Sequence, residues 1–431
     1  MTAPARANTI YALSSGLPPA AIAIVRVSGP EAAMALERLA GRVPPPRRAM
    51  FSSLHDPQSS EKLDDALALF FPGPGSATGE DLAEFHLHGG RSVVAAVLDA
   101  LSGLDGLRPA EAGEFTRRAF ENGRIDLTEA EGIADLLMAE TQSQRRAALA
   151  LAGGALSREV AGWQDRLLAI AARVEAEIDF SDEDDVETSA DEAWRAVLLA
   201  LAGDIRAALS RPPVERLKDG IRVVIAGPPN AGKSTLINAL AGRDVAITSP
   251  IAGTTRDVVE APVAVSGLPF ILTDTAGLRA SGDIVEGMGI ERAQAQIAAA
   301  DLILWLGPFD ARPDPDRTIV IAGKIDVTSA DPRADVALSA VTGEGMDRLL
   351  GLLRERAMRL LPGEGEVAIN ARHRAALEEA LNRLNEAAGS SDLLIVAEGL
   401  RQARSAFDAI TGRAGVENML DALFGRFCIG K

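Results

Sequence analysis

One short stretch in the middle of the chain constrains the fold more than any other. The apolar run Ile221–Ala226 leads into Gly-Pro-Pro-Asn-Ala-Gly-Lys-Ser at 227–234, and a helical pattern, Thr-Leu-Ile-Asn-Ala-Leu-Ala-Gly, follows. This is the pattern of a phosphate-binding loop, set as it must be between a buried strand and a helix. Strand-like and helix-like runs then alternate up to residue 360, which predicts a parallel sheet covered by helices. Further strands are expected at Phe270–Thr273, Leu302–Leu306 and Thr318–Ala322.

The loop itself predicts how a nucleotide phosphate is held. Gly227 and Gly232 let the backbone curl so that several N–H groups point at phosphate oxygens, and the helix N-terminus adds partial positive charge. Lys233, which we also expect to be catalytic, would reach the β- and γ-phosphates, while the Ser234 hydroxyl would ligate magnesium. Nucleotide contacts are expected from Asn230, Ala231, Gly232, Lys233, Ser234 and Thr235.

Two polar stretches downstream complete this phosphate site. Asp274-Thr275-Ala276-Gly277 ends a strand, so Asp274 can hold magnesium through water and the Gly277 N–H can sense the γ-phosphate. Thr254-Thr255-Arg256-Asp257 lies between the two motifs, where a switch threonine must reach the magnesium, and we assign that role to Thr255. The alternative is an ordinary polar loop. The expected nucleotide contacts here are Thr254, Thr255, Asp274, Thr275, Ala276 and Gly277.

The base is predicted to be guanine because of Asp326 in Gly323-Lys324-Ile325-Asp326. A carboxylate accepts hydrogen bonds from the ring N–H and amino group of guanine, whereas adenine presents the reversed pattern, which opposes an ATPase. Lys324 belongs to the same loop, and Ser339-Ala340 would supply a backbone N–H to the guanine carbonyl. GTPases normally carry Asn where this chain has Gly323. Losing one neutral hydrogen bond costs about 0.5–1.5 kcal/mol, so we expect weaker binding with specificity kept by Asp326.

The catalytic group is harder to place. Small Ras-like switches carry Gln after the Asp-Thr-Ala-Gly motif, but Leu278 cannot orient water. Another polar residue must do so, and the stretch Asp283-Ile284-Val285-Glu286 offers one. The sequence indicates no arginine finger, and a cation could supply the equivalent charge.

The rest of the chain predicts additional domains. A length of 431 residues exceeds one ordinary core. Residues 1–118 mix β-rich runs with a helix-like stretch, Arg91–Leu104, which indicates α/β or α+β structure. Residues 119–217 and 361–431 are helical in pattern, around an insert at 218–360. The β-rich runs are Ala21–Val27, Ala66–Phe71 and Leu82–Leu87. Three buried helical faces are expected. The first consists of Ile133, Leu136, Leu137 and Glu140, the second of Trp163, Leu167, Ile170 and Val174, and the third of Leu377, Leu381 and Leu384.

Composition excludes several classes of protein. The net charge of −17 means that any contact with RNA needs a local patch or a partner. A single cysteine excludes an intrachain disulfide framework and fits a reducing cytosol, so we expect a cytoplasmic protein. The N-terminus has no signal-peptide core, and no apolar run approaches 18 residues, so a membrane role is not expected.

Several stretches together resemble the MnmE/TrmE family of tRNA uridine-modification GTPases. They are Ala23–Gly29, Thr78-Gly79-Glu80-Asp81, His88-Gly89-Gly90, Ala112–Phe120, Asp126–Glu131 and the closing Cys428-Ile429-Gly430-Lys431. The resemblance implies a folate-binding, aminomethyltransferase-like α+β domain that mediates homodimerisation, an all-α helical domain, and an inserted Ras-like P-loop GTPase domain. It implies GTP, magnesium, potassium and a 5-formyl- or 5,10-methylene-tetrahydrofolate as cofactors. With an FAD-binding MnmG/GidA-type partner, in a heterotetramer, such proteins add an aminomethyl or carboxymethylaminomethyl group to carbon 5 of the wobble uridine of certain tRNAs.

The resemblance also implies site residues. Arg26, Glu84 and Arg124 match folate-contacting positions, although Arg124 stands where the family typically has Lys, and Ala77 stands where it has an aromatic residue. Lys431 is a further candidate folate contact, with the alternative that it only ends the chain. Glu286 matches the glutamate that positions the attacking water. Asn230 matches the potassium-binding Asn, with Ser249, Ile251 and Thr254 as further potassium contacts. The switch loop Ser249, Pro250, Ile251, Ala252, Gly253, Thr254 and Thr255 is expected at the nucleotide.

Some alternatives stay open at this point. Arg26 and Glu84 could be a surface pair, and Glu286 a solvated helix-end residue. Cys428 could be a small buried hydrophobe or a nucleophilic, ligand-contacting thiol, and we carry it as a candidate catalytic residue. His86 and His88 are more typical of a strand than of a metal site. The whole chain could also be a regulatory GTPase switch that binds ribosomes or other RNA without modification chemistry.

Overall fold

The computed structural model describes residues 9–179, 191–243, 260–274, 294–363, 365–413, 417–425 and 427–431. The chain divides into two compact units, Met1–Ala134 with Asp408–Lys431, and Asp135–Phe407. This division differs from the three predicted domains, because the last residues of the predicted helical domain group with the N-terminal region. No helix among the described residues is both long and apolar enough to cross a membrane.

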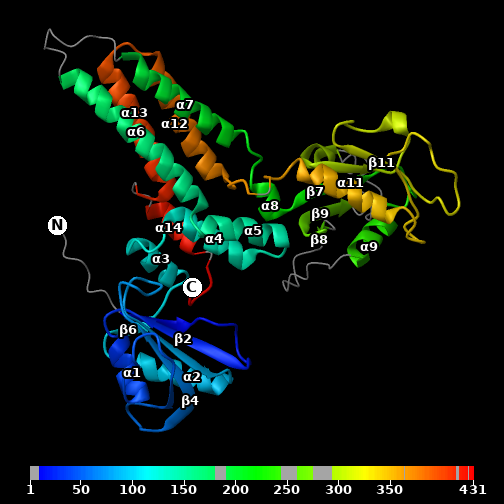
Figure 1. Cartoon of the computed structure of the whole chain (residues 1–431). Helices are drawn as coiled ribbons and strands as arrows, with labels where there is room; N and C mark the ends of the chain where they lie inside the picture. The colour runs from blue at the N-terminus through cyan, green and yellow to red at the C-terminus, as the bar shows by residue number, and fades with distance from the viewer. Residues whose placement is uncertain are drawn as a thin grey trace, which may run out of the picture. The chain divides into compact units, whose positions relative to one another are not determined.

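The first unit is built on a mixed sheet (Figure 1). Within the described residues its strand order is β3-β4-β5-β2-β1-β6, with β1 antiparallel to β2 and parallel to β6. The elements of this unit are β1 (Thr9–Leu13), β2 (Ile22–Ser28), α1 (Ala32–Ala40), β3 (Met50–His55), β4 (Lys62–Phe71), β5 (Leu82–His88), α2 (Arg91–Ser102), β6 (Leu107–Pro109), α3 (Glu114–Glu121), α14 (Glu417–Phe424) and the first part of α4 (Leu127–Met138).

Strand periodicity separates the two faces of this sheet. Val25 of β2 and Phe85 of β5 are fully buried in one cluster with Leu36 of α1 and Val97 of α2, so both helices cover the same face. Because strand side chains alternate, the neighbouring residues of β2 and β5 point to the opposite face. Arg26 and Glu84, two of the predicted folate contacts, therefore lie on the face that α1 and α2 leave uncovered.

A second apolar cluster joins distant parts of the sequence in this unit. Leu127 of α4 packs with Leu420 and Phe424 of α14, and the Phe424 ring centroid is 6.4 Å from that of Phe120. The cluster holds the C-terminal helix against the segment that follows the sheet. The chain end is thus tied to the N-terminal region.

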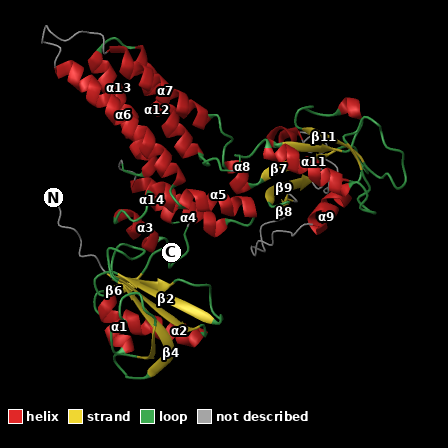
Figure 2. Cartoon of the chain, in the orientation of Figure 1, coloured by secondary structure: helices red, strands yellow, loops and turns green. Residues whose placement is uncertain are grey.

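The second unit contains a helical bundle and a second sheet (Figure 2). The bundle elements are the end of α4, α5 (Gln142–Ala152), α6 (Ala155–Asp179), α7 (Asp191–Leu209), α12 (Ala371–Gly389) and α13 (Leu393–Thr411). Thr141 and Gln144 form a capping box that begins α5, and Asn370 and His373 form one that begins α12. The remaining elements are α8 (Glu215–Asp219), β7 (Ile221–Ala226), α9 (Lys233–Arg243), β8 (Glu260–Val265), β9 (Leu268–Asp274), β10 (Leu302–Trp305), the 3-10 helix η3 (Phe309–Ala311), β11 (Thr318–Ala322), β12 (Val336–Ala337) and α11 (Met346–Met358).

Most of the predicted helical faces are confirmed. Trp163, Leu167, Ile170 and Val174 of α6 are buried, and so are Leu377 and Leu384 of α12. The face predicted through Leu137 and Glu140 is wrong, because α4 ends at Met138 and Leu137 is exposed. Here α4 buries Leu127 and Ala130 instead, on a face set by the C-terminal helix that packs against it.

The second sheet brings the nucleotide motifs to one edge. Its order within the described residues is β12-β11-β10-β7-β9-β8, and β7 runs parallel to both β9 and β10. Parallel strands end at the same edge, so the carboxyl ends of β7, β9 and β11 lie there together. This confirms the predicted α/β arrangement.

Candidate functional site

The loop after β7 has the geometry of a phosphate cradle. Gly227 has φ +150°, and a Cβ there would come within 2.9 Å of the Leu306 carbonyl oxygen, so only glycine fits. The Lys233 ammonium is buried and donates to the carbonyls of Gly227 and Pro228 at 3.0 and 2.9 Å. The side chain of the predicted lysine therefore turns back onto the first residues of its own loop.

The predicted magnesium residues meet where β7 and β9 end, with Ser234 in the first turn of α9 and Asp274 as the last residue of β9. The Ser234 hydroxyl donates to the Asp274 carboxylate at 2.7 Å. This contact follows from the sheet, because Ile225 of β7 pairs with Asp274 of β9. A hydroxyl and a carboxylate are hard oxygen donors, so the pair fits magnesium.

The base loop lies beside the phosphate loop. A cavity of about 260 Å³ is lined by residues of both, including Ala231, Thr235, Gly323, Lys324, Asp326 and Ala340. The Lys324 ammonium donates to the carbonyl of Asn230 at 2.6 Å and braces one loop against the other. Sequence reasoning missed this brace, because it named only the absent Asn side chain as the link between the loops.

The structure also separates the two residues predicted to read the guanine carbonyl. The Ser339 N–H already donates to the carbonyl of Glu344 at 3.0 Å. Among the described residues the Ala340 N–H has no such partner. Of the two, the Ala340 N–H is therefore the one left to donate to a ligand. Ser339 shapes the turn through its buried hydroxyl, which accepts from the N–H groups of Val341 and Thr342.

Part of the predicted site lies outside the described residues. These are the switch and catalytic positions Ser249, Pro250, Ile251, Ala252, Gly253, Thr254, Thr255, Thr275, Ala276, Gly277 and Glu286, together with Leu278 and Asp283. Of the predicted potassium contacts only Asn230 is described; it is exposed, with φ +62°.

In the first unit the predicted folate residues Arg26 and Glu84 are direct partners. They lie opposite each other on β2 and β5, and Arg26 Nε is 2.8 Å from Glu84 Oε1. His86 Nε2 lies 3.0 Å from the other oxygen of Glu84. Burial raises the pKa of Glu84, but the hydrogen bonds from His86 and Arg26 outweigh it and lower that pKa below its usual value. The two histidines lie on β5 as predicted, and His88 pairs with Asp64.

A buried polar network stands next to this pair, and sequence reasoning gave it no role. Ser28, at the end of β2, bonds Thr78 at 2.7 Å and Glu80 at 2.8 Å, while Arg118 of α3 contacts Glu80 at 2.9 Å. Asn122 donates to the Thr78 carbonyl at 2.8 Å. The Thr-Gly-Glu-Asp motif and the arginine of the next motif therefore hold each other. Arg124 lies against the same loop, since a Cβ on Gly79 would meet its Cγ at 3.1 Å.

The C-terminal tail reaches this sheet. Ile429 bridges Ala112, and a Cβ on Gly430, whose φ is +95°, would fall 2.1 Å from the Leu13 carbonyl. Leu13 pairs with Val25, next to Arg26 in β2. Cys428 is exposed, so the interpretation of Cys428 as a buried hydrophobe is wrong. Lys431 is half-buried, and its N–H donates to the Cys428 carbonyl at 3.2 Å.

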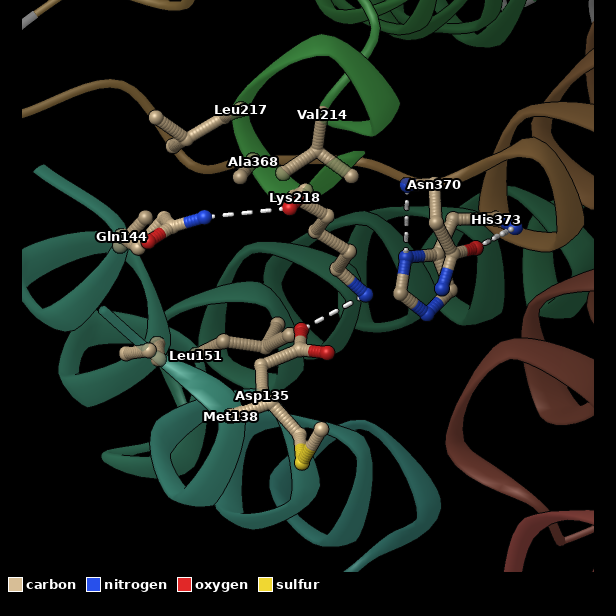
Figure 3. Close-up of a pocket in the computed structure, with 13 residues that line it drawn as sticks. Asp135, Met138, Gln144, Leu151, Val214, Leu217, Lys218, Ala368, Asn370 and His373 are labelled. Carbon is tan, nitrogen blue, oxygen red and sulfur yellow. Dashed lines mark hydrogen bonds and ion pairs between the residues drawn. The ribbon is translucent and has the colours of Figure 1, made fainter. Parts of the chain in front are cut away.

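A second cavity, of about 70 Å³, lies beside α8 (Figure 3). None of its lining residues lines the cavity between the base loop and the phosphate loop. Lys218 of α8 pairs with Asp135 of α4 at 2.7 Å, and Gln144 of α5 donates to the Lys218 carbonyl at 3.1 Å. His373 and Asn370 are joined by the capping box of α12. Because these polar groups already have partners, we interpret the cavity as a packing feature beside α8, not as a ligand site.

Comparison with known proteins shows the family to which the chain belongs. The family described as the MnmE helical domain matches residues 127–428, and the one described as the GTP-binding protein TrmE N-terminus matches 9–124. The tRNA modification GTPase MnmE of Rhizorhabdus wittichii is 59% identical over 98% of this chain and 97% of its own length. That of Erythrobacter litoralis is 57% identical over 98% of this chain and 100% of its own. The crystal structure of the T. maritima FeoB G domain is 25% identical, covering 32% of this chain and 98% of its own, with a TM-score of 0.24. The chain belongs to the MnmE family of tRNA modification GTPases.

Proposed function

We propose that this chain hydrolyses GTP to drive modification of the wobble uridine in certain tRNAs. The observation that carries the proposal is the meeting of Lys233, the Ser234–Asp274 pair and Asp326 at one sheet edge, in a member of this family. The proposed domains are a folate-binding domain at 1–118, a helical domain at 119–217 and 361–431, and a GTPase domain at 218–360. The proposed location is the cytoplasm.

The described residues account for nucleotide recognition. Lys233, which is held by two neutral carbonyls, can turn to phosphate oxygens and gain a charge-assisted bond there. Ser234 and Asp274 would hold magnesium, which neutralises charge developing on the phosphates. Asp326 accepts from the guanine edge, and the Ala340 N–H donates to its carbonyl. Lys324 fixes the distance between the base loop and the phosphate loop.

The assignment of water positioning and of most cation contacts falls on residues outside the described set. Glu286 would orient the attacking water, and Thr255 would complete the magnesium shell. Potassium would be held by Asn230 with Ser249, Ile251 and Thr254, and would supply the charge of the missing arginine finger. We expect faster hydrolysis in potassium than in sodium, with the difference lost in Asn230→Ala. Equal rates in both salts would remove the cation from the mechanism.

The folate site is proposed on the open face of the first sheet. Arg26 is held by Glu84, and the tail with Cys428 and Lys431 ends beside the adjoining strand. An arginine fixed by a carboxylate keeps its remaining N–H groups available for a ligand carboxylate. Titration with 5-formyltetrahydrofolate should saturate, and Arg26→Gln should weaken it. No saturable binding would favour the regulatory switch over the modification enzyme.

The proposed partners are a second copy of the chain, an MnmG/GidA-type FAD-binding protein and tRNA. The open sheet face supports the dimer, because it exposes Ile22 by 60%, Phe51 by 67% and Leu67 by 41%. Phe51 and Leu67 lie directly opposite each other on β3 and β4. Analytical ultracentrifugation should give a dimer that Phe51→Glu weakens.

The test of the whole proposal is chemical. Mass spectrometry of wobble-uridine nucleosides should show loss of the carbon-5 modification in cells lacking this protein. The wild-type gene should restore it, and Lys233→Ala should not. Full modification in the deletion strain would refute the proposal.

A further inference from the structure

Four arginines gather in a short segment of the first unit that contains no acidic residue. Arg38, Arg42, Arg47 and Arg48 fall between Glu37 and Asp56, and no Asp or Glu lies in between. Elsewhere acidic residues are frequent, with 61 in the chain against 44 Lys and Arg. We call these four residues the arginine segment. It is a locally basic stretch in a chain whose net charge is −17.

The fold presents all four side chains to solvent. Arg38 is on the outer side of α1, whose Leu36 and Leu39 are buried, and Gly41 in the left-handed conformation ends the helix. Arg42, Arg47 and Arg48 follow in the loop to β3, and each of the four is exposed. The loop is anchored, because the Arg47 N–H donates to the Phe70 carbonyl at 2.8 Å.

The charges of the arginine segment are not neutralised within the fold. None of the four guanidiniums forms an ion pair with a carboxylate of the described residues. Arg47 donates to the Gly75 carbonyl and lies 5.8 Å from the Phe71 ring centroid. Among the described residues, the hydrogen bond of the Arg42 side chain is to the Met50 sulfur. By contrast, Arg26, Arg108, Arg117 and Arg118 of the same unit are all paired with carboxylates.

We propose that the arginine segment binds the phosphate backbone of RNA, an inference that rests on the proposed tRNA substrate. An acidic protein repels a polyanion over most of its surface, so RNA can approach closely only where acidic side chains are absent. Guanidinium groups suit this role, since their planar donors bind phosphate oxygens in pairs. Four such groups along a helix end and one loop fit repeated phosphates and not a single small anion.

The test compares two triple variants of the full chain. One is Arg38→Gln/Arg42→Gln/Arg48→Gln, which spares Arg47 because that side chain holds the loop at Gly75. The matched control is Arg173→Gln/Arg206→Gln/Arg404→Gln, which removes three exposed arginines of α6, α7 and α13 that, among the described residues, also form no ion pair. The probe is a labelled, unmodified tRNA transcript followed by fluorescence anisotropy at several salt concentrations.

The expected result is a loss of tRNA affinity of about tenfold or more at low salt, and a fall in the salt-dependence slope of about two, in the first variant only. GTP hydrolysis without RNA should be unchanged in both. Unchanged affinity in the first variant, or an equal loss in the control, overturns the assignment while leaving the proposed function in place. If the unaltered chain binds no tRNA, the proposed substrate and this surface fall together.

Discussion

The two candidate sites of this chain differ in what holds their charged groups. In the first unit, these charged groups form ion pairs: Arg26 is paired with Glu84, and Arg118 with Glu80. At the phosphate loop, the buried ammonium of Lys233 is held by the neutral carbonyls of Gly227 and Pro228.

This difference predicts which variants change the stability of the fold and which change nucleotide binding. A buried ion pair loses much when one partner is removed, because the other charge stays buried and unpaired. The Lys233 ammonium lies at the phosphate loop, where it can bind phosphate oxygens, so we expect its removal to be felt mainly when the nucleotide binds. Variants that break the buried Arg118–Glu80 pair should therefore lower the free energy of unfolding, and variants of the second site should leave the protein folded but inactive.

The largest effect is expected from Arg118→Met. The Arg118 side chain is 9% exposed and contacts both Glu80 and Glu114. Its loss leaves Glu80 without a cationic partner among the described residues, while Glu114 keeps Arg108. We expect the free energy of unfolding to fall by about 3–5 kcal/mol. Urea denaturation followed by circular dichroism measures it. Arg91→Met, at an exposed arginine of the same unit, is the control, and equal losses would contradict the comparison.

Lys233→Ala should act on the reaction and not on the fold. Each lost charge-assisted bond to phosphate costs about 1.5–3 kcal/mol, so GTP hydrolysis should fall by about two orders of magnitude. The urea midpoint of the nucleotide-free protein should hardly change. Lys62→Ala, which removes an exposed lysine of the first sheet, serves as control. A large fall in the urea midpoint of Lys233→Ala would contradict the proposed difference between the two sites.

Gly323→Asn should strengthen the second site. A Cβ at Gly323 would lie 3.6 Å from the Ala231 carbonyl oxygen and from Leu306 Cδ2, which is ordinary contact. The added amide can supply the bond that this base loop lacks, worth about 0.5–1.5 kcal/mol, or up to roughly tenfold in affinity for GDP. Calorimetric titration measures the gain, and Gly323→Ala, which adds the Cβ without the amide, should not show it.

The smallest expected effect concerns pH at the first site. Hydrogen bonds from His86 and Arg26 hold the pKa of Glu84 below its usual 4.5, despite burial. The ionised carboxylate therefore contributes stability that is present above pH 4.5 and is lost as pH falls through the lowered pKa. Melting temperatures of Glu84→Gln and the wild type should differ at neutral pH and converge in acid. A constant difference would mean that this ionisation does not stabilise the fold, and Glu61→Gln, at an exposed position, is the control.

Short-range pattern was enough to place much of this protein from its sequence. The phosphate loop after Ile221–Ala226, the strands at Leu302–Leu306 and Thr318–Ala322, and the buried stripe of α6 were predicted correctly or within a residue or two. Each depends on side-chain periodicity or on a motif whose backbone chemistry is local. The parallel sheet then fixed the meeting of Ser234 and Asp274, because β7, which leads into the loop before Ser234, and β9, which ends at Asp274, end at one edge.

What the tertiary structure alone decided are contacts between residues far apart in sequence. The tail beside Leu13, the Lys324 brace on Asn230, the Arg118–Glu80 pair and the face that α4 buries depend on which surfaces happen to meet. No periodicity encodes such a meeting, since it is set by how whole elements pack. The sequence therefore determined which chemical groups this protein carries, and the packing of its elements determined which of them are already paired and which remain for a ligand.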